Sequence, residues 1–151
     1  MNFLDGHLFP ENQQPLIITA APYAPGWQPS DFPEDIPVTM EDQIQKAVDC
    51  YNAGATVLHL HVRELDGKGS KRLSKFNELI AGVRKAVPEM IIQVGGSISF
   101  APESDGQAAK WLSDDTRHML ADLDPVPDQV TVTVNTSQMN VTDHMEDGDV
   151  I

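Results

Sequence analysis

The segment Thr56-Val57-Leu58-His59-Leu60-His61-Val62 is the most informative part of the sequence, because it has the composition of a buried strand and carries two histidines near its end. Apolar and β-branched runs are typical of parallel strands that are covered on both faces. Side chains alternate across a strand, so His59 and His61 are predicted on one face, about 7 Å apart along the backbone. Both imidazoles could then bind one metal ion at about 2.1 Å. The alternative is a pair of histidines that are satisfied inside a core or partly exposed.

Three further segments are predicted as strands, at residues 16–20, 90–94 and 129–134. The segments between the strands have the periodicity of amphipathic helices. The first helix is expected to begin at Thr39, with Asp42 in a variant capping box, and to end at Ala53-Gly54. Its predicted apolar face consists of Ile44, Ala47, Val48 and Tyr51.

The second helix is expected to begin with Ser74 as its cap and to stop before Pro88. Its predicted apolar face consists of Phe76, Leu79, Ile80 and Val83. A third helical pattern runs from about Gly106 to Leu120. The resulting order, β-α-β-α-β-α-β, predicts a parallel sheet with right-handed crossovers.

This alternation predicts an α/β fold of the TIM (β/α)8-barrel type, with only the first four βα units present. A complete barrel takes about 250 residues, and the chain has 151. We expect a leader at residues 1–14, the N-terminal half of a barrel at 15–140 and an irregular acidic tail at 141–151. The chain is thus expected to be half of a longer protein, and a complete small open α/β domain is the competing interpretation.

Composition mainly excludes classes of function. The formal charge of −13 disfavours binding to nucleic acids or anionic lipids, which require basic surface. No apolar run approaches the roughly 20 residues of a membrane helix. The single cysteine, Cys50, rules out an internal disulfide framework and suits a reducing compartment, so we predict a cytoplasmic protein.

A metal site needs more than the two predicted imidazoles. A catalytic zinc usually takes three protein ligands and leaves one position open. The remaining histidines are His7 in the leader, His118 on a predicted helix and His144 in the tail. Of these three, His144 is the least unsuitable as a third ligand. Arg63 follows His61 by two residues and could clamp a carboxylate or phosphate. It could equally form a surface ion pair with Glu64 or Asp66.

Other candidates lie at the ends of the third and fourth strands. Gly95-Gly96-Ser97 could bring backbone N–H groups and a hydroxyl to a ligand, or form a plain turn. Thr131 shares a strand face with Thr133 and Asn135, which could line a site or simply suit β geometry. A local basic cluster, defined as Lys68, Lys71, Arg72 and Lys75, could meet phosphates or form an ordinary solvated surface.

Several of these segments resemble the β-keto acid cleavage enzymes, a family that includes the 3-keto-5-aminohexanoate cleavage enzyme of lysine fermentation. The similarity spans about residues 15–140. It rests on Pro15-Leu16-Ile17-Ile18-Thr19-Ala20-Ala21, on Cys50-Tyr51-Asn52-Ala53-Gly54-Ala55 leading into His59-Leu60-His61-Val62-Arg63, and on Pro88-Glu89-Met90-Ile91-Ile92-Gln93-Val94. The Ala-Gly-Ala block followed by His-x-His-x-Arg is its most specific part.

The resemblance implies a TIM barrel that holds zinc or a similar divalent ion and condenses a β-keto acid with acetyl-CoA. The products would be a new CoA ester and acetoacetate. The family's two metal-binding histidines fall on His59 and His61, and its threonine on strand four matches Thr131. Gly95 and Ser97 are the further candidates for substrate binding. The third ligand, a glutamate, and the catalytic residues are expected beyond residue 151.

Two departures from the family pattern affect the expected substrate. Gly26 stands where the family often has a substrate-contacting glutamate, and Gly95-Gly96-Ser97 replaces a Ser-Thr-Gly-Gly pattern. Two alternatives to the acyltransferase are a metal-dependent hydrolase of the amidohydrolase type and an inactive half-barrel fragment. The expected partners are a small β-keto acid and acetyl-CoA, and we expect the full-length enzyme to be a homo-oligomer.

Overall fold

The computed structural model describes residues 16–23, 27–32, 35–95 and 119–131. These residues form one parallel sheet in the order β1-β2-β3-β4, as the alternating pattern predicts. The strands are β1 (Thr19–Ala20), β2 (Val57–Leu60), β3 (Ile91–Gly95) and β4 (Gln129–Thr131). The chain therefore has an α/β fold. Within the described residues, neither helix has the length and apolar run that crossing a bilayer would require.

Helix α1 (Met40–Asn52) begins where the sequence predicts. The Thr39 side chain accepts a hydrogen bond from the Asp42 N–H at 3.1 Å and so satisfies one of the free donors of the first turn. The helix is followed by Ala53 and then by Gly54, whose φ of +102° lies in the region that favours glycine. The predicted cap and helix end are both confirmed.

Helix α2 (Leu73–Ala86) starts earlier than predicted. Its N-cap is Arg72, which makes no side-chain capping bond, so the prediction of Ser74 as the cap is wrong. The reason lies upstream, where the Ser70 hydroxyl accepts the Arg72 N–H at 3.2 Å and already turns the chain into the helix. The predicted apolar face is confirmed, because Phe76, Leu79, Ile80 and Val83 are all buried.

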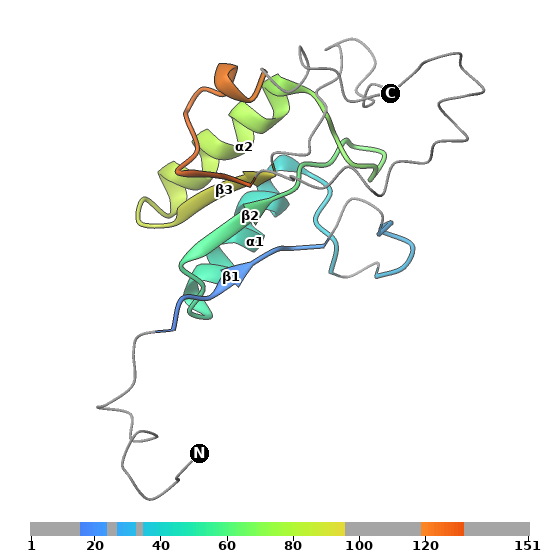
Figure 1. Cartoon of the computed structure of the whole chain (residues 1–151). Coiled ribbons are helices and arrows are strands. Elements are labelled where there is room, and N and C mark those ends of the chain that lie inside the picture. Colours follow the sequence, from blue (N-terminus) through green and yellow to red (C-terminus); the bar gives the residue numbers. More distant parts are fainter. Residues whose placement is uncertain (1–15, 24–26, 33–34, 96–118, 132–151) are drawn as a thin grey trace, which may run out of the picture.

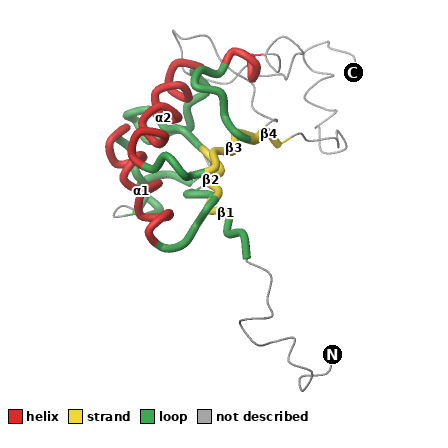
Figure 2. The backbone as a smooth tube through the Cα atoms, turned by 90° about the vertical axis from the view of Figure 1, so that its left-hand side faces the viewer, coloured by secondary structure: helices red, strands yellow, loops and turns green. Residues whose placement is uncertain are grey.

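Both helices cover the same face of the sheet (Figures 1 and 2). Leu58 and Leu60 of β2, with Ile92 and Val94 of β3, share a core with residues of the two helices. The helices approach closely at Gly82, where an added Cβ would lie 2.3 Å from Cδ1 and 2.9 Å from Cγ1 of Ile44. The opposite surface of the sheet, which we call the helix-free face, carries no helix in the described part of the chain (Figure 2).

The two outer strands are less covered than predicted. Leu16 and Ile17, which precede β1, are 83% and 72% exposed, and all three residues of β4 are exposed. The physical reason is position, because β1 and β4 are the edges of the described sheet and only the central strands have neighbours on both sides. The predicted third helix lies mostly outside the described residues, which show only a 3-10 turn at Met119–Asp122.

Candidate functional site

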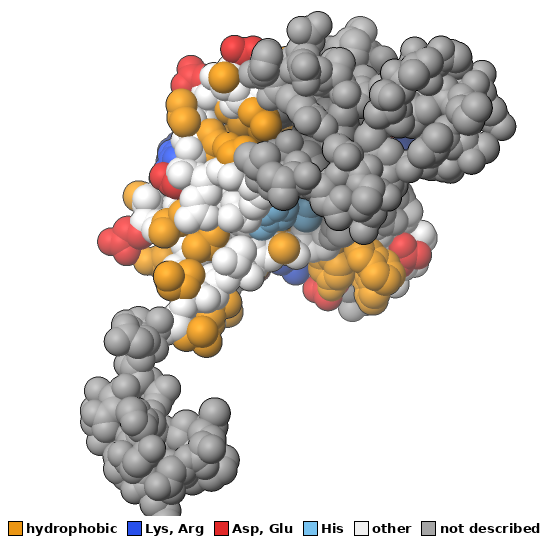
Figure 3. All heavy atoms as spheres, viewed as in Figure 1, with side chains coloured by type: hydrophobic (Ala, Val, Ile, Leu, Met, Phe, Trp, Pro, Cys, Tyr) orange, Lys and Arg blue, Asp and Glu red, His pale blue; other side chains and the backbone are white. Residues whose placement is uncertain are grey.

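His59 and His61 lie side by side at the carboxyl end of β2. His59 belongs to the strand and His61 follows its last residue, so the alternation of side chains brings both rings to the helix-free face. Their ring centroids are 4.9 Å apart and the ring planes cross at 72°. The histidine side chains form a small patch on that face (Figure 3). The predicted geometry of the pair is therefore confirmed.

The two imidazoles have different surroundings. Nδ1 of His59 is 2.8 Å from Oε1 of Gln93 on the neighbouring strand. Nδ1 of His61 is buried and has no hydrogen-bond partner in the described part of the protein. Burial lowers the pKa of the His61 imidazole, and the neighbouring His59 lowers that pKa further, while the Pro22 carbonyl opposes them. A lowered pKa keeps the ring neutral, which is the state that binds metal ions.

Arg63 stabilises the segment that follows the histidines. It is only 4% exposed, so it does not have the surface position that the ion-pair alternative requires. Its guanidinium Nη1 donates to the carbonyls of Trp27 at 2.8 Å and Gly67 at 2.6 Å. Its backbone N–H donates to Oε1 of Gln43, a buried side chain of α1, at 3.0 Å. These bonds fix the loop immediately after His61 against both α1 and the segment around Trp27.

Three members of the local basic cluster are paired with acids. Lys68 lies 3.3 Å from Asp66, Arg72 lies 3.0 Å from Glu64, and Lys75 lies 3.0 Å from Glu78. These three members therefore take part in local ion pairs on the described surface.

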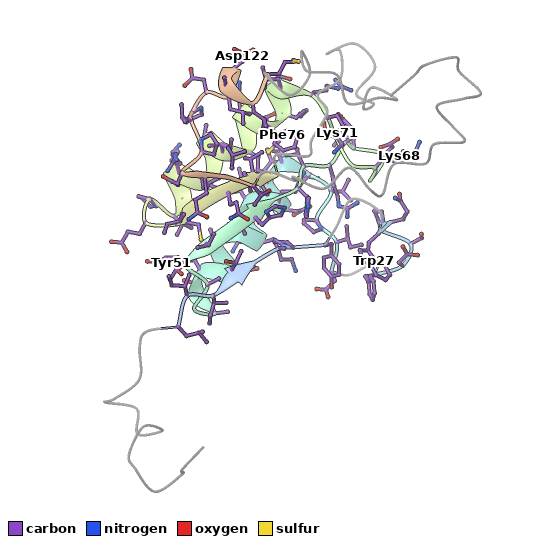
Figure 4. The ribbon with its side chains drawn as sticks, in the orientation of Figure 1. Trp27, Tyr51, Lys68, Lys71, Phe76 and Asp122 are labelled. Atoms are coloured by element: carbon purple, nitrogen blue, oxygen red, sulfur yellow. The ribbon has the colours of Figure 1, made fainter. Side chains whose placement is uncertain are left out.

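Lys71 is the exception in this cluster. It is half-buried near the carboxyl end of β2, whereas Tyr51 marks the opposite end of the sheet (Figure 4). Burial lowers the pKa of Lys71, and its charge in turn lowers the pKa of His61.

The predicted substrate-binding residues are partly described. Gly95 ends β3 and pairs with Thr131 at the end of β4, so the two lie next to each other at the same end of the sheet as the histidines. Laterally paired residues of a parallel sheet share a face, and both positions are two residues beyond the row of Gln93 and Gln129. Thr131 is exposed and Gly95 is buried. Ser97, Gly26 and the predicted leader and acidic tail lie outside the described residues.

The described residues supply two imidazoles of a possible metal site. They contain no group of three or more His, Cys, Asp or Glu side chains that could hold a metal ion. His7, His118 and His144 lie outside the described ranges, so none of them is tested as a third ligand. The two neighbouring rings still fit part of a zinc site, because one buried nitrogen lacks a partner and a neutral ring offers a lone pair.

Sequence reasoning missed two features of this site, the buried Gln43 and the glutamine row beside His59. Gln93 lies between Ile92 and Val94, so the alternation of apolar and polar residues in β3 already assigns it to the histidine face. Gln43 gave no comparable signal, because a single polar residue in an amphipathic helix is normally placed on the solvated face.

Comparison with known proteins gives one family and several relatives. The model of the beta-keto acid cleavage enzyme family matches residues 15–150. A 3-keto-5-aminohexanoate cleavage enzyme from Acetoanaerobium sticklandii is 37% identical over 90 residues, covering 58% of this chain and 33% of the relative. A 3-oxoadipate:acetyl-CoA acetyltransferase from Cupriavidus necator is 31% identical over 116 residues, covering 69% of this chain and 40% of the relative. The matched part thus spans between a third and two fifths of these relatives.

Among solved structures, a ternary complex of ObcA with a C4-CoA adduct and oxalate is similar, with a TM-score of 0.45 and 22% identity. The match covers 64% of this chain and 23% of that chain.

Proposed function

Because the chain belongs to the beta-keto acid cleavage enzyme family, we propose that it forms the metal-binding half of an enzyme that condenses a β-keto acid with acetyl-CoA. The products would be a CoA ester and acetoacetate. The observation that carries the proposal is the pair of imidazoles, 4.9 Å apart on the helix-free face at the carboxyl end of β2. The Cupriavidus necator relative is named for the transfer of an acetyl group from CoA.

The architecture of the described sheet supports a barrel. Its four parallel strands follow one another in chain order, and both helices cover one face. In a TIM barrel the helices lie outside, the other face of the sheet points inward, and the active site lies at the carboxyl ends of the strands. We therefore propose that residues 15–140 provide the first four βα units of a TIM barrel, between a leader at 1–14 and an acidic tail at 141–151.

In this proposal His59 and His61 bind a divalent ion, for which zinc is the first choice because imidazole is a common zinc ligand. A third ligand, a glutamate, would come from beyond residue 151. When bound, the ion would act as a Lewis acid that polarises the keto oxygen and stabilises negative charge on it. Gly95 at the end of β3 and Thr131 at the end of β4 lie at the same end of the sheet as the histidines, where a hydroxyl and backbone groups can orient the substrate. Ser97 stays a predicted substrate contact.

The amidohydrolase alternative is less well supported. It requires further histidines at strand ends, and the described residues include only His59 and His61. The inactive-fragment alternative predicts the same fold and is separated from the proposal by experiment. A cytoplasmic location and homo-oligomeric assembly also stay predictions for the full-length enzyme.

The test measures zinc binding by the 151-residue chain with elemental analysis and chelator competition. We expect about one equivalent of zinc. The His59→Ala, His61→Ala double variant should weaken zinc binding by more than about 100-fold. This loss exceeds the roughly 10–100-fold loss of affinity that is typical when a residue hydrogen-bonded to a metal ligand is replaced. His7→Ala, a histidine outside the proposed site, is the control and should bind normally. Zinc content that the double variant leaves unchanged would refute the proposal.

The reaction itself is tested with acetyl-CoA and a panel of β-keto acids, using this chain and the longer protein in parallel. Acetoacetate formation that depends on acetyl-CoA supports the acyltransferase. Hydrolysis without acetyl-CoA would favour the amidohydrolase type. Activity in the longer protein and none in this chain is the result the proposal predicts, because the third ligand and the catalytic residues are expected beyond residue 151. An inactive longer protein would favour the inactive-fragment alternative.

A further inference from the structure

A row of three polar side chains crosses the helix-free face beside the histidine pair. His59 of β2 pairs in register with Gln93 of β3, which pairs with Gln129 of β4. Their side chains are hydrogen-bonded in sequence, with 2.8 Å from Nδ1 of His59 to Oε1 of Gln93 and 2.9 Å from Nε2 of Gln93 to Oε1 of Gln129. We call these three residues the amide row.

The chemistry of the amide group gives this row a direction. An amide side chain has one end that only accepts and one end that only donates. Since Nε2 of Gln93 donates to Gln129, its Oε1 faces His59 and can only accept. Nδ1 of His59 must therefore carry the hydrogen. A neutral imidazole has one N–H, so the lone pair of His59 lies on Nε2.

We propose that Gln93 and Gln129 are positioning residues that hold His59 in its Nδ1–H tautomer and so present Nε2 as the metal-binding atom. The part of this inference that concerns metal rests on the proposed function above. The tautomer does not, because it follows from the hydrogen bonds among the three side chains. Histidines that bind metals usually donate their other N–H to an oxygen, which fixes the ring and increases its basicity.

The neighbouring His61 makes the role of the row clearer. Its Nδ1 has no hydrogen-bond partner among the described residues, and its ring contacts His59 edge to face. His59 is thus held by the side chains of the amide row, whereas His61 interacts with the Pro22 carbonyl and packs against His59. Removal of the row should disturb His59 directly and His61 through that ring contact.

The first measurement is the tautomeric state of His59 in the metal-free full chain. The protein is labelled with 15N-histidine and studied by long-range 1H–15N correlation at a pH where the imidazoles are neutral. We expect the Nδ1–H pattern for His59 in the wild type and a shift toward Nε2–H in Gln93→Leu. Gln93→Glu keeps an accepting oxygen and should retain Nδ1–H. An Nε2–H pattern in the wild type would mean that the row runs in the opposite direction, and would overturn the inference.

The second measurement is zinc affinity by competition with a chromogenic chelator. Gln93→Leu should weaken zinc binding about 10–100-fold, as loss of a residue that hydrogen-bonds a metal ligand usually does. Gln93→Glu should restore binding, and Gln129→Leu should have a smaller effect. Gln45→Leu, an exposed glutamine of α1, is the matched control. Wild-type affinity in Gln93→Leu would overturn the metal part. If the tautomer shifts as expected and neither this chain nor the longer protein binds zinc, the tautomer stands and the proposed function fails.

Discussion

Gln43 offers a sharp test of how the histidine loop is held in place. Its side chain is buried and makes hydrogen bonds in two directions. Nε2 donates to the carbonyls of Val38 at 3.0 Å and Thr39 at 3.2 Å, and Oε1 accepts the Arg63 N–H at 3.0 Å. The perturbation is Gln43→Leu, which keeps the approximate size of the side chain and removes all three bonds.

The expected loss of stability follows from what each partner retains. The Thr39 carbonyl also accepts the backbone N–H of residue 43, so it stays satisfied. The Arg63 N–H loses this acceptor, which costs about 1–3 kcal/mol when the group is buried. Loss of the hydrogen bond to the Val38 carbonyl adds a further cost of about 0.5–1.5 kcal/mol. Burial of a leucine offsets about 1 kcal/mol. The net decrease in the free energy of unfolding is therefore about 0.5–3.5 kcal/mol.

The assay is urea denaturation of the full chain, followed by far-UV circular dichroism and extrapolated to zero denaturant. The control is Gln45→Leu, because Gln45 lies on the same helix but is exposed and its amide donates to the Asp49 carboxylate of the next turn at 2.9 Å. That substitution should change stability by less than about 0.5 kcal/mol. Equal unfolding free energies for the two variants would refute the role assigned to Gln43.

Two more predictions concern the turns and the acid stability of the sheet. The hydrogen bond from the Ile92 N–H is the main cause that lowers the pKa of the Asp128 carboxyl. The ionised carboxylate therefore contributes its full stabilisation above the ordinary aspartate pKa. That contribution is lost as the pH falls through the lowered pKa of the folded state. In Asp128→Asn the free energy of unfolding, measured by denaturation, should therefore decrease less between neutral and acidic pH than in the wild type. An equal decrease in the two proteins would contradict this. Gly67→Ala should destabilise more than Gly54→Ala in thermal denaturation. Both have positive φ, but only at Gly67 would a Cβ meet Pro29, at 2.5 Å. The reverse order would show that the Pro29 contact is easily relieved.

Features that depend on local periodicity could be predicted from the sequence. The cap at Thr39 needs only the residues of one turn, and the apolar face of α2 needs only helical spacing. The shared face of His59 and His61 follows from strand alternation alone. The parallel order of the strands follows from the alternation of strands and helices, because a connection through a helix returns the chain in the same direction.

Features that depend on distant loops could not be predicted. The burial of Arg63 results from carbonyls at Trp27 and Gly67, which are 36 residues before it and 4 after it in the chain. Nothing in the spacing of residue types indicates that these carbonyls converge on one guanidinium. The start of α2 differs from the prediction for a local reason, because the hydroxyl of Ser70 and not that of Ser74 accepts a backbone N–H where the helix begins. The amide row needed the register of three strands before it could be recognised.

The close approach of the two helices at Gly82 and Ile44 has a mechanical consequence for the site. Packed interiors transmit displacement because they contain little free volume. A shift of α2 toward α1 would therefore be passed on at this point rather than absorbed, and α1 carries the glutamine that anchors the loop after His61. The contact at Gly82 thus connects the packing of α2 to the helix that holds the loop after His61.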